Sequence, residues 1–157
     1  GDGDYAMYAS AIWTAVHYRA PLLCVINNNN TWGNDERHQI EVAKDRNRPR
    51  ENAWIGQRMV DPAVDHAMNA RSYGAWAAGP VTEPGDLAKV LAEAVKQVEN
   101  GRVVVVDIAF ASEASGADSF QKITQAFIDG LGPRLVADHG LDDPDEIVAE
   151  GRRVLEH

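Results

Sequence analysis

The sequence predicts an α/β fold: a doubly wound, mainly parallel sheet with helices on both faces. Short, continuous apolar runs at 22–26 and 103–108 are typical of strands that are covered on both faces of such a sheet. Segments with a helical period separate these runs. The resulting order of helix, strand, long loop, helix, strand, helix, strand is the alternation expected of a parallel sheet.

The first helix is predicted over 5–19, where Ile12, Ala15 and Val16 recur at spacings of three and four and Pro21 ends the segment. The strand at 22–26 follows directly. Residues 31–51 are polar and highly charged, without a sustained apolar period, which predicts a long loop. Such a loop is either a lid facing the substrate or a solvated connector, and both readings stay open.

The second half of the chain continues the alternation. Asp61-Pro62 predicts an N-cap with proline in the first helical turn, and Val64, Ala67, Met68 and Arg71 then form one helix face, which Gly74 closes. The stretch from Trp76 to Val81 is irregular or strand-like. A clear helix begins at 83–86 and ends at Asn100-Gly101, before the most convincing strand in the chain, at 103–108.

Two short motifs carry the chemistry: Gly-Asp-Gly-Asp at 1–4 and four asparagines at 27–30. Asp2 offers a hard anionic oxygen, and its flanking glycines allow the backbone to approach a phosphate closely. The strand at 22–26 leads into the asparagines, whose side chains offer neutral amide oxygens. One carboxylate, one amide and one backbone carbonyl suit Mg²⁺, so the pair of motifs predicts a metal–diphosphate site.

A GDG triplet followed, some twenty-odd residues later, by an NN pair resembles the cofactor motif of thiamine diphosphate (ThDP) enzymes. Residues 11–21 (AIWTAVHYRAP) are similar to the benzoylformate decarboxylase and acetolactate synthase branch of that family, and the resemblance runs from residue 1 to about 110. It implies the ThDP-binding fold, specifically the diphosphate-binding domain, with ThDP and Mg²⁺ as cofactors.

In that family the metal ligands are the Asp of GDG, the second Asn of the pair and a main-chain carbonyl two residues later. The family spacing places the pair at Asn28-Asn29, so the resemblance implies Asp2, Asn29 and the carbonyl of Thr31 as ligands. It also implies Trp32, Asn34, Asp35 and His38 as candidates for lining the substrate pocket. The implied cofactor-binding residues are Gly1, Asp2, Gly3, Asp4, Asn29, Thr31 and Trp32, although Asp4 stands where the family often carries a small hydroxyl residue.

The resemblance further implies a 2-oxo acid decarboxylase or carboligase that breaks or forms C–C bonds through a carbanion–enamine on the cofactor. The glutamate that activates the aminopyrimidine ring belongs to a pyrimidine-binding domain of the same or a partner chain, and no catalytic residue is assigned in this sequence. A homodimer or homotetramer is implied, because such active sites form between two subunits. On this reading the 157-residue chain alone is inactive.

Alternative readings remain open at this stage. Gly1-Asp2-Gly3-Asp4-Tyr5-Ala6 also fits the G-x-G-x-x-G/A fingerprint of an NAD-binding Rossmann-type domain, although no acidic residue ends the following strand. A non-catalytic assembly module that retains the fold is a second alternative. Another ThDP reaction, such as acyl-CoA lyase chemistry, shares every motif.

Composition narrows the class of protein. The chain has 157 residues, 45% hydrophobic and 25% charged, as in an ordinary globular domain. A net charge of −9 argues against nucleic acid or an anionic membrane as the main partner. The lone Cys24, in an apolar strand, fits a small buried residue and a reducing compartment, and we expect a cytoplasmic protein.

The domain organisation follows from these elements. Residues 1–110 are predicted to form the diphosphate- and magnesium-binding domain, and 111–154 a C-terminal helical tail. The chain begins on the functional loop, so we expect a strand before Gly1 and read the chain as the C-terminal piece of a longer protein. Leu155-Glu156-His157 resembles the start of a purification tag.

Overall fold

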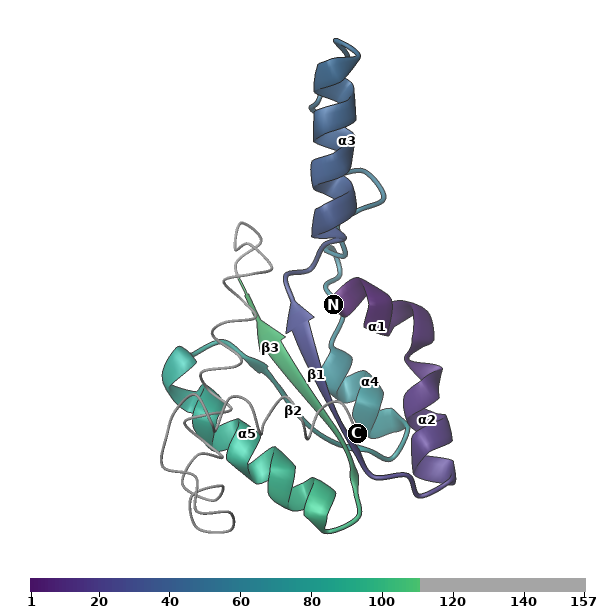
Figure 1. Ribbon diagram of the computed structural model, residues 1–157, viewed down its shortest axis with the longest axis vertical. Helices are drawn as coiled ribbons and strands as arrows, with labels where there is room; N and C mark the ends of the chain where they lie inside the picture. The colour runs from purple at the N-terminus through teal and green to yellow at the C-terminus, as the bar shows by residue number, and fades with distance from the viewer. Residues whose placement is uncertain (111–157) are drawn as a thin grey trace, which may run out of the picture.

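The structure, a computed structural model, describes residues 1–110; the predictions for 111–154 and 155–157 lie outside the described residues. Three strands form one parallel sheet: β1 (Leu22–Asn28), β2 (Trp76–Val81) and β3 (Val103–Ala109). Their order is β1–β3–β2, with β3 in the centre (Figure 1). The predicted α/β class with a parallel sheet is confirmed.

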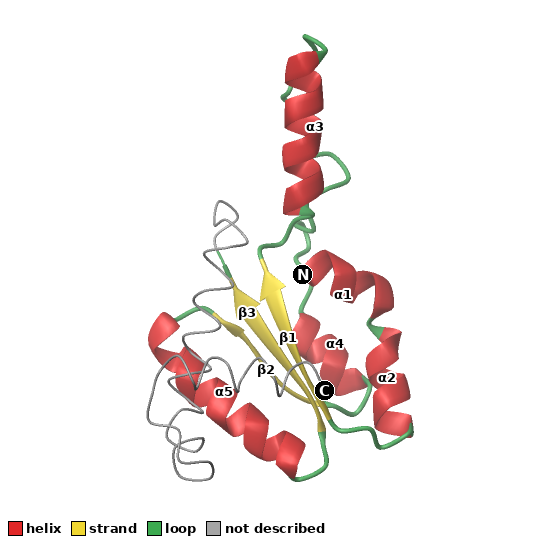
Figure 2. Cartoon of the chain, in the orientation of Figure 1, coloured by secondary structure: helices red, strands yellow, loops and turns green. Residues whose placement is uncertain are grey.

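Helices cover both faces of the sheet (Figure 2). On one face, α1 (Asp2–Tyr8), α2 (Ser10–His17) and α4 (His66–Ser72) pack through residues such as Tyr5, Ile12 and Ala70. On the other face lies α5 (Pro84–Glu99), which buries Leu87, Leu91 and Ala94. Full burial of one leucine such as Leu91 contributes about 1.5–3 kcal/mol to the free energy of unfolding. Because each face carries its own cluster of buried residues, both contribute to the core.

Side-chain alternation along the strands divides this core in two. In β3, Val103 and Val105 face α1, α2 and α4, whereas Val104, Val106 and Ile108 face α5. In β1, Leu22, Cys24 and Ile26 share the face of Val105. The alternation therefore also fixes the face on which each residue near the carboxyl ends of these strands lies.

The predicted first helix is broken into two. A single helix over 5–19 is wrong: α1 begins at Asp2, the backbone turns at Ala9, and α2 follows. A backbone bond from Ile12 N–H to the Ala9 carbonyl marks the turn. Neither glycine nor proline lies at this bend, so the sequence carries no local signal for it.

The helix expected from Asp61 begins later. Asp61 has φ of 59°, which is not helical, and Asp65 is the N-cap, with its Oδ1 accepting from Met68 N–H at 2.6 Å. The predicted packing face is also shifted, since Ala67 is buried but Met68 is 62% exposed. The N-cap at Asp61 is therefore wrong: the cap lies four residues later, where the helix that it begins buries Ala67.

The long loop predicted over 31–51 contains a helix, α3 (Gly33–Asp45), so this prediction is wrong. The helix buries none of its residues and stands out from the sheet at the carboxyl end of β1 (Figure 1). An unburied helix needs no apolar period. Asp35 and Glu36 in its first turn and Lys44 in its last complement the helix dipole instead.

The remaining elements follow the predictions more closely. The helix from Pro84 is confirmed, with proline in its first turn. The irregular or strand-like stretch at Trp76 is the edge strand β2. In the part of the chain that the structure describes, no helix has the length and apolar character needed to cross a membrane.

Candidate functional site

The Asp2 carboxylate lies buried at the start of α1, with 2% of the residue exposed. Burial raises the pKa of Asp2, and backbone N–H groups, including that of Asn30, together with the electrostatic effect of His66 oppose this rise. Within residues 1–110 its Oδ2 has no hydrogen-bond partner. A buried anionic oxygen without a partner is what a metal ligand presents in the absence of its ion.

The asparagine loop after β1 folds on its own side chains. Asn28 Oδ1 accepts from the Asn30 N–H at 3.0 Å, and Asn29 Oδ1 accepts from the Thr31 N–H at 3.2 Å. Asn30 has φ of 55°, a left-handed conformation that asparagine tolerates better than most residues. This use of short amide side chains turns the chain sharply at the end of the strand.

The segment 57–59 holds the loop from its other side. Met59 N–H donates to the Asn30 carbonyl and Trp32 N–H donates to the Gln57 carbonyl, both at 2.8 Å, so that Thr31 pairs with Arg58 as an isolated antiparallel bridge. In such a bridge the N–H and C=O of Thr31 point away from residues 57–59. They point to the side on which the Thr31 N–H meets Asn29.

The two motifs touch each other. A Cβ added to Gly3 would lie 2.7 Å from Cδ2 and Cε2 of Trp32, so the indole lies directly on the backbone of Gly3. The backbone N–H of Asn30 reaches the carboxylate of Asp2. A Cβ added to Gly33 would lie 3.0 Å from the amide nitrogen of Asn29. Residues from both motifs therefore surround one site.

A polar cluster supports Thr31 from α3. Glu36 Oε2 accepts from Thr31 Oγ1 at 3.0 Å, and Glu36 Oε1 pairs with Arg58 Nη2 at 2.6 Å. The hydrogen bond from Arg58 lowers the pKa of Glu36. Glu36 and Arg58 line a hollow of about 490 Å³, together with Asn29, Asn30, Thr31, Gly33, Arg37, Ile40 and Val60.

The predicted substrate-lining residues lie elsewhere on α3. Asn34, Asp35 and His38 are exposed and do not line this hollow, and Asn34 instead accepts from Arg37 Nη2 at 3.1 Å. Asp4 is also exposed. Contact of these four side chains with a substrate or cofactor stays a prediction.

Two buried polar residues near the site were not predicted. His66 and Asp107 are each 1% exposed. In the described chain, both ring nitrogens of His66 and the Oδ1 of Asp107 lack a hydrogen-bond partner. The His66 ring meets the Tyr5 ring edge-on at 5.3 Å. A sequence signal existed for Asp107, because it is an acid inside the apolar run 103–108; His66 gave none.

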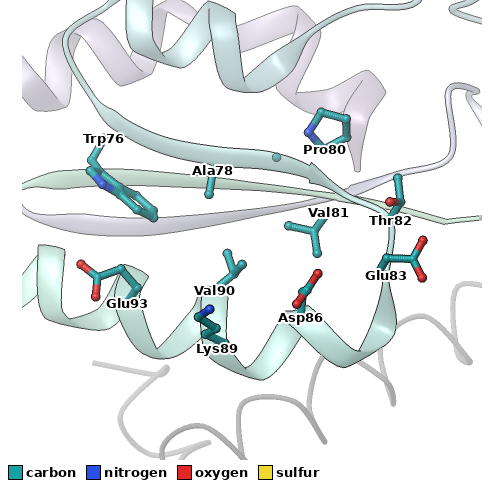
Figure 3. Close-up of a pocket in the computed structure, with 11 residues that line it drawn as sticks. Trp76, Ala78, Pro80, Val81, Thr82, Glu83, Asp86, Lys89, Val90 and Glu93 are labelled. Carbon is teal, nitrogen blue, oxygen red and sulfur yellow. The ribbon is translucent and has the colours of Figure 1, made fainter.

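A second hollow, of about 520 Å³, lies between β2 and α5 (Figure 3). Trp76, Ala78 and Val81 line it from the strand, and Glu83, Asp86, Lys89 and Glu93 from the helix and the residue before it. It contains no residue of either motif and lies on the α5 side of the sheet, so it is separate from the Asp2 site.

The residues around Asp2 fit Mg²⁺ and a diphosphate. The donor set combines the partner-free oxygen of Asp2, the side-chain oxygen of Asn29, which keeps a second lone pair, and the carbonyl of Thr31. These are hard oxygen donors, which Mg²⁺ prefers. Residues 1–110 contain no group of three or more His, Cys, Asp or Glu that could hold a metal ion.

Comparison with known proteins agrees with this geometry. The family model described as "Thiamine pyrophosphate enzyme, C-terminal TPP binding domain" matches residues 1–108. The large subunit of acetolactate synthase isozyme 3 from Escherichia coli (strain K12) is 30% identical over 108 residues, which cover 69% of this chain. The matched region spans 17% of that relative, and no solved structure matches the chain significantly. The chain belongs to the thiamine pyrophosphate enzymes and carries their C-terminal TPP-binding domain.

Proposed function

We propose that this chain is the Mg²⁺- and diphosphate-binding part of a ThDP-dependent enzyme that breaks or forms a C–C bond in a 2-oxo acid. The observation that carries the proposal is the buried Asp2 carboxylate, with one oxygen free, beside the asparagine loop. A stable protein rarely retains such an oxygen unless a ligand completes it. Family membership supplies ThDP as the cofactor to test.

Three groups of the chain would hold the metal: the Asp2 carboxylate, the Asn29 side-chain oxygen and the Thr31 carbonyl. The turn from Asn29 to Thr31 and the bridge between Thr31 and Arg58 fix the two neutral donors before any ion arrives. Preorganisation of this kind raises affinity, because little conformational freedom remains to be lost on binding. The ion then offsets the charge of the diphosphate beside Asp2.

Bound ThDP supplies the electron sink for C–C cleavage, and the protein supplies binding and orientation. Trp32 would define one wall of the site, since its indole is held on Gly3. The hollow beside Glu36 and Arg58 is the space from which a substrate would approach this wall. Arg58 and Arg37 line that hollow and would attract the carboxylate of a 2-oxo acid.

The rest of the active site would come from a pyrimidine-binding domain of the same or a partner chain, within a homodimer or homotetramer. The glutamate that activates the cofactor would reside there. The similarity to an acetolactate synthase large subunit makes condensation of two 2-oxo acids the first reaction to test, with simple decarboxylation as the second.

Calorimetric titration of ThDP into the full-length protein, with Mg²⁺ and then with EDTA, tests the proposal. We expect binding that requires Mg²⁺ and that Asp2→Ala abolishes while the protein remains folded. A screen of 2-oxo acids with the loaded protein would then separate carboligation from decarboxylation. Full-length protein that binds no ThDP in Mg²⁺ would overturn the enzyme assignment and leave a non-catalytic module with the same fold.

A further inference from the structure

A layer of buried polar residues lies directly under the asparagine loop. Asn28 follows Cys24 and Ile26 on the face of β1 that meets α1 and α4, and Asp107 follows Val103 and Val105 on the same face of β3. Asp107 is paired in register with Ile26, so Asn28 is its diagonal neighbour. At the carboxyl edge of the sheet, the apolar face therefore ends in an amide and an acid.

Asp107 places a carboxyl group where burial is unfavourable for its charge. It is 1% exposed, burial raises the pKa of its carboxyl, and its Oδ1 has no partner in the described chain. Asp65 and Asp2 act electrostatically against its ionisation, whereas His66 opposes the rise in its pKa. An apolar residue would continue the run Val103–Val106 without this desolvation penalty. A carboxylate retained in such a place points to a role outside packing.

The side chain of Asn28 connects Asp107 to the loop. Asn28 is 4% exposed, and a hydrogen bond from its side chain lowers the pKa of Asp107. Its Oδ1 accepts from the Asn30 N–H at 3.0 Å. The Asn28 side chain thus lies between the Asp107 carboxyl and the backbone of Asn30.

The connection continues to the carboxylate that would bind the metal. The Asn30 N–H, which donates to Asn28, also reaches the Asp2 carboxylate. Asn30 lies between Asn29 and Thr31, which carry the two neutral donors. A displacement of Asn28 would therefore move the backbone on which both donors depend.

The neighbouring strand fixes the position of Asp107 itself. The pairing of β2 with β3 becomes irregular between Ala78 and Val81, beside Asp107. Gly79 in this interval has φ of 130°, and a Cβ there would lie 2.5 Å from the Asp107 carbonyl oxygen and 2.7 Å from its Cβ. The backbone of the edge strand therefore lies directly against Asp107, and only a glycine leaves room for this approach.

We propose that Asp107 is a positioning residue for the metal loop: through Asn28 it holds Asn29, Asn30 and Thr31 in the conformation that presents their oxygens to Mg²⁺. The inference rests on the proposed function for its ligand, but the loop geometry that it concerns exists without the ligand. Outer partners of this kind orient the ligating groups, and their loss typically weakens metal binding about 10–100-fold.

The test compares Asp107→Val with Asp107→Asn in the full-length protein. Valine continues the apolar run, so we expect metal-free thermal stability equal to or above that of the parent. Mg²⁺-dependent ThDP affinity should nevertheless fall about 10–100-fold by calorimetry. Asparagine keeps an oxygen that can accept from Asn28, and its affinity should stay close to the parental value. Val105→Ala, on the same strand face but below the polar layer, is the control that lowers stability and leaves affinity unchanged.

A double-mutant cycle and amide exchange give two further readouts. If Asp107 acts through Asn28, then Asn28→Ala with Asp107→Val loses no more affinity than Asn28→Ala alone. Hydrogen exchange at the Asn30 amide, measured without metal or cofactor, should be faster in Asp107→Val and unchanged in Val105→Ala.

The inference would be overturned if Asp107→Val bound ThDP with parental affinity. It would also be overturned if affinity fell only in proportion to a loss of stability, as in an ordinary core variant. If the parent itself binds no ThDP in Mg²⁺, the proposed function fails. The amide exchange of Asn30 then decides the positioning role alone: faster exchange in Asp107→Val sustains it and unchanged exchange refutes it.

Discussion

The indole ring of Trp32 lies on the backbone of Gly3, so close that a Cβ on Gly3 would be 2.7 Å from two of its ring carbons. The contact joins the first helix to the end of the asparagine loop, across a separation of nearly thirty residues in the sequence. The glycine serves here to admit an aromatic side chain from within the protein. Close approach of a phosphate to Gly3, as the sequence suggests, is a separate prediction.

Gly3→Ala should displace Trp32, because the added Cβ would lie 2.7 Å from two carbons of its ring. We expect weaker Mg²⁺-dependent ThDP binding and a fall of about 1–3 kcal/mol in the free energy of unfolding, as for overpacking elsewhere. Urea denaturation and calorimetric titration measure the two effects. Gly85→Ala is the matched control, since no atom lies within 4 Å of a Cβ there. Equal behaviour of the two variants would contradict the assignment.

Asn29→Ala should reduce Mg²⁺-dependent ThDP affinity strongly, whereas Asn27→Ala should have a mild effect. Asn29 Oδ1 turns toward Thr31 in the loop, while Asn27 follows Leu23 and Val25 on the α5 face of β1. Calorimetric titration of both variants checks this order. The reverse order would shift the ligand assignment by two residues.

Glu36→Gln should loosen the support of Thr31 in a pH-dependent way. The hydrogen bond from Arg58 holds the pKa of Glu36 below its ordinary value of 4.5, so the ionised form is favoured in the folded state. This contribution is present at neutral pH and is lost as the pH falls below 4.5 and through the lowered folded value. Thermal melting should therefore separate parent and variant at pH 7, and the gap should close in acid. A gap independent of pH would contradict the ion pair as its cause.

Asp107→Asn should show the opposite pH trend in metal-free protein. Burial raises the pKa of Asp107 above 3.8, so the folded state favours the neutral acid. The parent then has its full stability below pH 3.8 and loses part of it as the pH rises through the folded value. The electrostatic effect of His66 limits the loss, while those of Asp65 and Asp2 increase it. Urea denaturation at a series of pH values should show that the free energy of unfolding of the variant increases relative to that of the parent as the pH rises toward 7. A difference that does not change with pH would contradict this prediction.

The sequence predicted those elements whose signal is local. The apolar run at Val103–Val106 and the helix from Pro84 were predicted correctly. Burial on both faces of a strand leaves a continuous apolar run, and burial of one helical face leaves an apolar period. The helix α3 was missed because none of its residues is buried, so its apolar period is weak. The break at Ala9 was missed because no residue there disfavours a helix.

The sequence by itself determined the class of fold and revealed the two motifs. Strands, helix ends and the GDG and asparagine motifs are each recognised from residues that are adjacent in the chain. Only the tertiary structure decided how those motifs meet. The contact of Trp32 with Gly3, the bridge of Thr31 with Arg58, and the layer of Asn28, His66 and Asp107 all join segments far apart in sequence. Such contacts depend on which residues share a sheet face and a register, and these are properties of the packed chain.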